Sequence, residues 1–162
     1  RDAPPPRRWR TSNTPSGPWT DRGMLMDAIQ RPEWAKTWIG VAGPPIAIGD
    51  GRFLMMYHRG HRDHENRREY DLAAALLDFR KEEIVRARIE PIMVPTGELE
   101  RRGEPDVGVD DVIYSCANYI WNNEVVIPYA GADSRIFVAS ARLGDLIGAL
   151  EVLAEPMHSS FA

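Results

Sequence analysis

The chain has 162 residues, a mass of 18.3 kDa and a formal net charge of −4, from 20 basic and 24 acidic residues. Its hydrophobic content of 43% and charged content of 27% are typical of a soluble globular domain and exclude a collagen, a coiled coil or a mostly disordered chain. The weakly acidic balance also argues against a general nucleic-acid binder.

Residues 1–23 are rich in Pro, Arg, Ser and Thr, and we expect residues 1–38 to be loop-rich. Two short extended pieces are expected around Trp9 and Trp19. Residues 24–30 could form a short helical turn, which Pro32 would limit. This region would supply the outer part of a structural unit that precedes the rest.

Two apolar runs follow, at residues 45–48 and 52–58, separated by Gly49-Asp50-Gly51. An Asp-Gly pair between such runs predicts a β-hairpin, because the turn needs positive φ angles that Gly adopts at little cost. After it we expect a polar loop over residues 58–69. Residues 70–78 fit either a helix or a strand, and their short length favours a strand. Residues 84–89 alternate apolar and basic side chains, as in a half-buried or edge strand.

The same pattern then recurs after a Pro- and Gly-rich connection. Two further apolar runs meet across Asn122-Asn123, a plausible two-residue turn because Asn tolerates the left-handed conformation. A third run follows, and apolar residues at helical spacing then predict a short helix. These expected elements are a strand at 112–121, a strand at 124–129, a strand at 134–140 and a helix at 143–153.

Two similar groups of short antiparallel strands suggest two blades of a β-propeller. We therefore predict an all-β fold of about two and a half blades with a short C-terminal helix, in a single partial propeller domain over residues 1–162. The expected divisions are 1–38 for the outer part of a preceding blade, 39–90 for a blade, 91–111 for a connection, 112–140 for a blade and 141–155 for the helix.

A histidine-rich segment, HRGHRDHE at residues 58–65, has the composition of a metal site. Arginines crowd it with positive charge, and a solvated loop without a metal is the favoured interpretation. The single cysteine, Cys116, excludes an internal disulfide and a multi-cysteine zinc site, and we expect it to be a buried strand residue. No apolar run approaches the ~18 residues that cross a bilayer, so we expect a cytoplasmic protein without a membrane partner.

Six segments of the chain carry a resemblance to a known family: 39–46 (IGVAGPPI), 50–58 (DGRFLMMYH), 70–79 (YDLAAALLDF), 84–95 (IVRARIEPIMVP), 109–117 (VDDVIYSCA) and 126–133 (VIPYAGAD). In order and spacing they resemble the sequence patterns of glycoside hydrolase family 130. Those patterns are IGAGxPPI…GWLLIYHG, YxLGAALLDL, VLARSPEPILEP, VPNVVFPCG and LYIYYGAAD.

The resemblance implies the C-terminal half of a five-bladed β-propeller. Members of this family are mostly phosphorylases of β-mannosides, which transfer mannose to inorganic phosphate with inversion and release mannose 1-phosphate. The family's proton-donating aspartate and several phosphate-binding arginines lie in the N-terminal half, and no position of this sequence corresponds to them. The catalytic residue is thus unknown, and because the chain begins at Arg1 we expect it to be incomplete.

The resemblance also implies site residues. Trp38 stands where phosphorolytic members usually carry Lys or Arg, and Lys36 would share its face of an extended segment. The expected phosphate-binding residues are His58 and Lys36, and the expected sugar-binding residues are Asp133, Tyr57, Tyr129 and Trp38.

Two other kinds of function stay open. A hydrolytic member would use water and a carboxylate base, for which Glu98 and Glu100 are weak candidates. A non-catalytic half-propeller would bind sugar or take part in an assembly. The expected partners are an oligosaccharide or β-mannoside, and either a second copy or an N-terminal half; phosphate is the only co-substrate expected, with no metal or organic cofactor.

Overall fold

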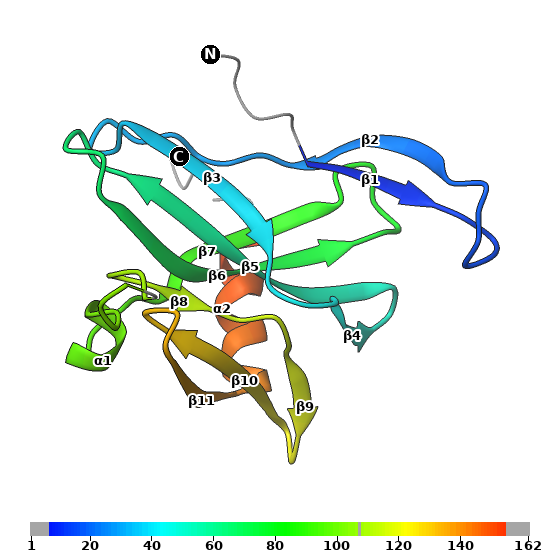
Figure 1. Cartoon of the computed structure of the whole chain (residues 1–162). Helices are drawn as coiled ribbons and strands as arrows, with labels where there is room; N and C mark the ends of the chain where they lie inside the picture. The colour runs from blue at the N-terminus through cyan, green and yellow to red at the C-terminus, as the bar shows by residue number, and fades with distance from the viewer. Residues whose placement is uncertain (1–6, 107, 155–162) are drawn as a thin grey trace, which may run out of the picture.

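The computed structural model describes residues 7–106 and 108–154, which fold into antiparallel β-sheets with two helices (Figure 1). The all-β fold class is confirmed. The elements are β1 (Arg7–Thr11), β2 (Thr20–Met26), β3 (Lys36–Val41), β4 (Ile46–Gly49), β5 (Arg52–Arg62), β6 (Arg68–Asp78), β7 (Val85–Met93), α1 (Glu98–Arg101), β8 (Ile113–Tyr114), β9 (Tyr119–Trp121), β10 (Glu124–Gly131), β11 (Arg135–Arg142) and α2 (Leu143–Ala154).

The central sheet has the order β3-β5-β6-β7, and β4 also pairs with β5. The predicted hairpin between β4 and β5 is confirmed, with positive φ angles at Asp50 (50°) and Gly51 (66°). Residues 70–78 are a strand rather than a helix, because β6 is paired on both sides and buried along most of its length.

The predicted polar loop over residues 58–69 is wrong. β5 continues to Arg62 and β6 begins at Arg68, so the loop shrinks to residues 63–67. The strands can extend because Arg59 lies directly opposite Asp71 in the ladder and the two charges pair inside the protein. His61 lies two residues further along β5, on the same face, and is also buried.

The second sheet has the order β11-β10-β8, with β9 also paired to β10. The predicted turn at Asn122-Asn123 is confirmed, with φ angles of 47° and 63°. The strand expected over residues 112–121 is broken into β8 and β9 by a kink at residues 115–118. The Ser115 hydroxyl holds this kink, since Oγ lies 2.8 Å from the Ala117 carbonyl and 2.7 Å from the Pro128 carbonyl.

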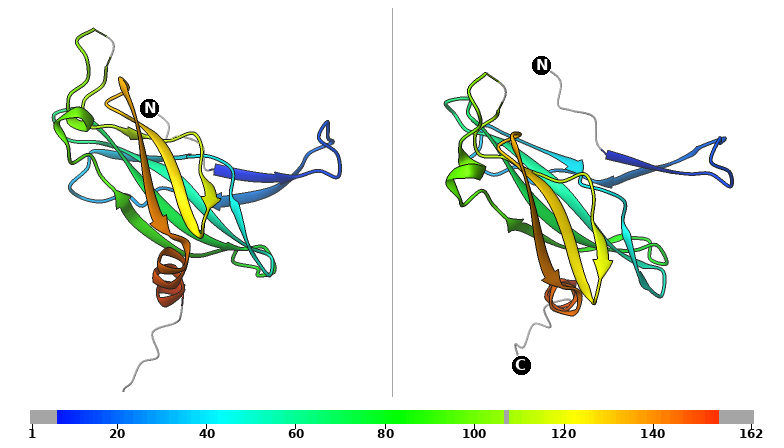
Figure 2. Two further views of the ribbon diagram at one scale, coloured as in Figure 1. Left: turned by 90° about the horizontal axis from the view of Figure 1, so that it is seen from below. Right: turned by 60° about the horizontal axis from the view of Figure 1, so that its bottom comes forward.

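Cys116 lies in that kink and is exposed, so the expectation of a buried strand cysteine is wrong. The short helical turn expected near residues 24–30 is wrong as well. Residues up to Met26 form β2, because they pair with β1 as an antiparallel hairpin. Figure 2 shows this hairpin extending away from the rest of the molecule.

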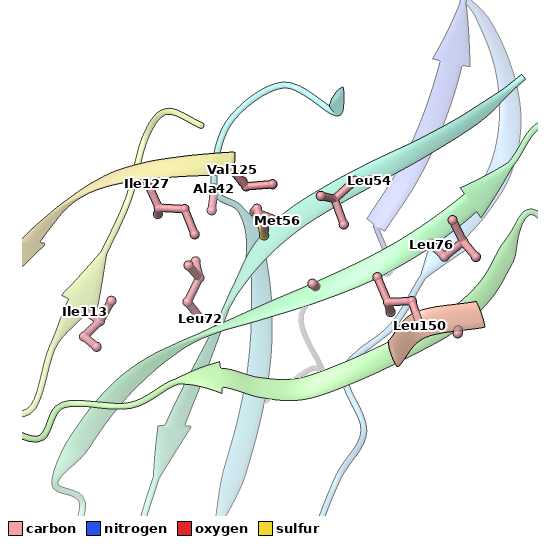
Figure 3. Close-up of a cluster of buried hydrophobic side chains, with 11 residues drawn as sticks. Ala42, Leu54, Met56, Leu72, Leu76, Ile113, Val125, Ile127 and Leu150 are labelled. Carbon is pink, nitrogen blue, oxygen red and sulfur yellow. The ribbon is translucent and has the colours of Figure 1, made fainter. Parts of the chain in front are cut away.

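The main apolar core lies between the central sheet, the second sheet and α2 (Figure 3). Leu150 of α2 is fully buried there, as the helical spacing predicts, and burying one such side chain contributes ~2 kcal/mol. A second cluster covers the opposite face of the central sheet. Its buried members are Met26, Ile39, Met55, Tyr57, Ala73, Ala75 and Leu77.

Candidate functional site

His58 lies in β5 on the face of the central sheet that points toward the second sheet, and only 3% of its surface is exposed. The backbone N–H of Ser115 donates a hydrogen bond to its Nε2 at 2.8 Å. The Tyr114 ring stacks on the imidazole, with centroids 4.1 Å apart and planes 7° from parallel. Both contacts come from β8 and the kink after it.

Burial lowers the pKa of His58 to about 4, because the charged ring would lose its hydration. The imidazole is therefore neutral near pH 7. A neutral ring offers one donor and one acceptor nitrogen, and Nε2 accepts the Ser115 N–H here.

Trp38 shares the face of His58. Its indole crosses over Gly60, where an added Cβ would lie 2.2 Å from the indole Cε2. Trp38 contacts Tyr70 edge-on at 5.6 Å, and Tyr70 contacts Tyr114 at 6.3 Å. These contacts connect Trp38 and His58, two of the predicted site residues, through a row of aromatic rings.

Lys36 begins β3 and is exposed, two residues before Trp38 and opposite Arg62 in the ladder. Side chains two apart in a strand point the same way, so Lys36 lies on the Trp38 side of the sheet. It is the predicted site residue most open to solvent on this sheet, which suits a cation that meets a ligand from outside.

Tyr57 lies on the opposite face from His58, although the two are neighbours in sequence. Its hydroxyl donates to Glu90, and burial together with this bond raises the pKa of Tyr57. The structure does not bring Tyr57 to His58. Its face holds an ionic network instead.

In that network Arg59 binds Asp71 through two nitrogens, at 2.8 and 2.5 Å, and lies 3.4 Å from Glu90. His61 reaches the same Asp71 at 3.0 Å, and Trp34 stacks on its ring at 4.5 Å. Burial alone would lower the pKa of Arg59, but Asp71 and Glu90 outweigh it and raise that pKa. Sequence reasoning missed this network, and the spacing Tyr57, Arg59, His61 was the available signal, because residues two apart share a strand face.

Tyr129 lies in β10 and its hydroxyl donates to Glu100 at 2.6 Å. Burial and this bond raise the pKa of Tyr129 to about 12. Glu100 also accepts the backbone N–H groups of Thr96 and Gly97, at 2.8 and 2.9 Å. Burial raises the pKa of Glu100, but these donors outweigh it and hold that pKa below its usual value. Glu100 thus anchors the loop before α1, while Glu98 is exposed.

Asp133 occupies the exposed turn between β10 and β11, with a φ angle of 52°. Tyr129 contacts Glu100 and Phe137, whereas the hydrogen bond and ring contact on His58 come from Ser115 and Tyr114. The described residues contain no set of three or more His, Cys, Asp or Glu side chains placed to hold a metal ion. Neither described helix is both long and apolar enough to cross a membrane.

The sequence model of glycoside hydrolase family 130, described as beta-1,4-mannooligosaccharide phosphorylase, matches residues 19–152. The chain belongs to glycoside hydrolase family 130. The match covers both large sheets and most of α2, so the segments that carry the resemblance and the folded elements coincide.

Two curated relatives come from Thermoanaerobacter sp. (strain X514). A 1,2-beta-oligomannan phosphorylase is 33% identical over 129 residues, which are 79% of this chain and 40% of that protein. A beta-1,2-mannobiose phosphorylase is 37% identical over 107 residues, or 65% of this chain and 32% of that protein. The chain therefore spans less than half the length of the curated relatives it matches.

A solved structure, the beta-1,2-mannobiose phosphorylase of Listeria innocua in complex with beta-1,2-mannobiose, resembles the fold with a TM-score of 0.62. Its sequence is 26% identical, and the match covers 84% of this chain and 35% of that one. The sheets described above thus form part of a family 130 propeller, as predicted.

Proposed function

We propose that this chain is part of a β-mannoside phosphorylase, in which inorganic phosphate displaces a β-linked mannose and mannose 1-phosphate is released. The observation that carries the proposal is the family match over residues 19–152, which includes every proposed site residue. The two curated relatives and the solved structure are phosphorylases of β-1,2-linked mannosides, and we propose that linkage for this chain.

In the proposed site, His58 and Lys36 bind phosphate. His58 would donate a hydrogen bond from a neutral ring, and Lys36 would supply the positive charge that Trp38 cannot. Trp38 would stack on a sugar face, which suits the flat apolar side of a pyranose. Asp133, Tyr57 and Tyr129 remain proposed sugar-binding residues, with Tyr57 the least supported because it faces the ionic network. No described residue is proposed as the catalytic acid.

The test uses the product of the complete reading frame that encodes this chain, with the 162-residue chain in parallel. Each is incubated with β-1,2-mannobiose and inorganic phosphate, and mannose 1-phosphate is measured. We expect the complete product to release it and to release no mannose when phosphate is left out. Free mannose without phosphate would instead show a hydrolase, and no product of either kind would contradict the proposal.

A hydrolytic variant would need a free carboxylate base. Glu100 is a poor one, since it is buried and accepts bonds from Tyr129, Thr96 and Gly97. Glu98 is exposed at the start of α1. Glu98→Gln is therefore the informative variant, and unchanged turnover in it would remove Glu98 as a base.

A second candidate function, a non-catalytic module that binds sugar or assembles, is favoured by an apolar face of the second sheet. Trp121 is 65% exposed, Ile136 85% and Val138 66%, and the ladder register places all three on one face. Such exposed apolar patches mark interaction surfaces. The partner would be the remaining blades of a longer protein or a second copy of this chain.

Native mass measurement tests the second candidate. We expect the 162-residue chain to form dimers or larger species, and Val138→Lys to shift it toward the monomer. Val152→Lys is the matched control, because Val152 is similarly exposed but lies on α2. A monomeric unsubstituted chain would contradict self-association through this face.

The proposed reaction transfers a glycosyl group to phosphate and takes phosphate as a co-substrate, with no metal or organic cofactor. We propose a cytoplasmic location, because a charged sugar phosphate made there is retained by the cell.

A further inference from the structure

The ring of His58 is held by a segment far from it in sequence. Ser115 donates its backbone N–H to Nε2 at 2.8 Å, and Tyr114 stacks on the ring at 4.1 Å. In the part of the chain that the structure describes, Ser115 is the sole hydrogen-bond partner of the imidazole. One backbone donor thus decides which ring nitrogen keeps the proton.

We propose that Ser115 is a positioning residue, whose backbone N–H fixes the His58 proton on Nδ1. The inference rests on the proposed function for its consequence, since the ring then offers a donor to an anionic oxygen of phosphate. The chemical ground is that neutral imidazole has one donor and one acceptor nitrogen, and the acceptor is already used.

Ser115 is itself fixed, so its N–H has a defined direction. Only 1% of Ser115 is exposed, and its hydroxyl lies within hydrogen-bond distance of the carbonyls of Pro128 and Ala117. The first contact ties the kink to β10, and the second closes the kink on itself. Together they hold the donor against His58 independently of any ligand.

The first experiment measures the ring directly in the full chain, labelled with ¹⁵N. Long-range ¹H–¹⁵N spectra distinguish a protonated from a bare imidazole nitrogen, and His58→Gln identifies the His58 signals. We expect a protonated Nδ1, a bare Nε2 and a scalar coupling through the hydrogen bond between the Ser115 and Nε2 nitrogens. A protonated Nε2, or rapid exchange of the proton between both nitrogens, would overturn the proposal.

Two variants separate the backbone from the hydroxyl. Ser115→Ala keeps the N–H and removes Oγ, so we expect it to retain the Nδ1 proton. Ser115→Pro removes the N–H, so we expect the proton to move to Nε2 or to exchange. Loss of the Nδ1 proton in Ser115→Ala would overturn the assignment to the backbone, and this holds even if Ser115→Pro does not fold.

These results are independent of catalysis. A protonated Nδ1 in a complete protein that makes no mannose 1-phosphate would defeat the proposed function and leave the inference intact. In an active protein, Ser115→Pro should raise the KM for phosphate about tenfold or more, because one hydrogen bond to an anion is misdirected. The KM for the mannoside should change little, whereas an equal rise in both would indicate a merely structural role.

Discussion

Tyr57, Arg59 and His61 project from one face of β5, and Met56, His58 and Gly60 project from the other. On the first face, buried charges exist as pairs, with Arg59 on Asp71 and Glu90. On the second face, His58 accepts a backbone N–H from Ser115, and burial keeps its ring neutral. Two titratable groups buried on one strand are thus stabilised in different ways. Arg59 keeps its charge because acids pair with it, whereas His58 gives up its charge. A neutral ring that is not used in an ion pair keeps an N–H that can donate to a ligand.

The largest expected effect on stability is on the face of β5 that carries Tyr57, Arg59 and His61, which we call the paired face. Asp71→Ala should lower the free energy of unfolding by ~3–5 kcal/mol, because it leaves the Arg59 guanidinium buried without its main partner. Urea denaturation measures the change. Glu65→Ala is the control, since it removes an ion pair with Arg67 that is exposed on both sides and should cost far less than Asp71→Ala. Equal costs for the two variants would break the comparison.

The face that carries Met56, His58 and Gly60, which we call the neutral face, should make the free energy of unfolding depend on pH. His58 titrates near 6.5 when unfolded and near 4 when folded, so the unfolded chain binds the proton more readily between these values. The neutral ring of His58 therefore stabilises the folded chain fully above about pH 6.5. As the pH falls toward 4, this contribution of ~3 kcal/mol to the free energy of unfolding is lost. Denaturation of the unsubstituted chain and of His58→Gln at several pH values isolates this contribution. Parallel pH profiles would contradict a neutral His58.

The packing of the neutral face predicts a smaller effect. Gly60→Ala should cost ~1–3 kcal/mol, because its Cβ would overlap the Trp38 indole. Gly40→Ala on β3 is the matched control, with no atom within 4 Å of its added Cβ, and it should be nearly neutral. In a Trp38→Ala background, Gly60→Ala should lose its cost, and a cost that persists would place the strain elsewhere.

The smallest expected effect on stability is again on the paired face. Tyr57→Phe removes a donor to Glu90, yet Glu90 keeps Arg88 at 3.2 Å and Arg59 at 3.4 Å. We expect a cost of ~0.5–1.5 kcal/mol in thermal or urea unfolding. A loss as large as that of Asp71→Ala would mean that Glu90 depends on the Tyr57 hydroxyl as strongly as Arg59 depends on Asp71.

The sequence supports prediction of what is local. Both tight turns, at Asp50-Gly51 and Asn122-Asn123, follow from residue types that adopt positive φ angles. The resemblance to the family patterns predicts which part of a propeller this chain forms. It also provides the phosphate-binding and sugar-binding residues, which stay predictions. Strand alternation also predicts that Tyr57 and His58 point to opposite faces of the sheet, once β5 is assigned as a strand.

Contacts between distant segments were not predictable in the same way. The loop expected after residue 58 became strand because Asp71 lies opposite Arg59, a pairing that only the β5–β6 register determines. Ser115 meets His58 across 57 positions of the chain. The kink that makes this contact interrupts an otherwise apolar run, and its residue-type signal is the pair of polar residues Ser115 and Asn118, which gives no indication of the contact with His58.

The kink also has a practical consequence for experiments. Cys116 is the chain's one cysteine, it is exposed, and it follows the residue that binds His58. A thiol-reactive fluorophore or ¹⁹F probe would therefore attach at one position beside the proposed phosphate site. Phosphate or mannoside binding to this chain could then be followed as a spectroscopic titration, without waiting for turnover.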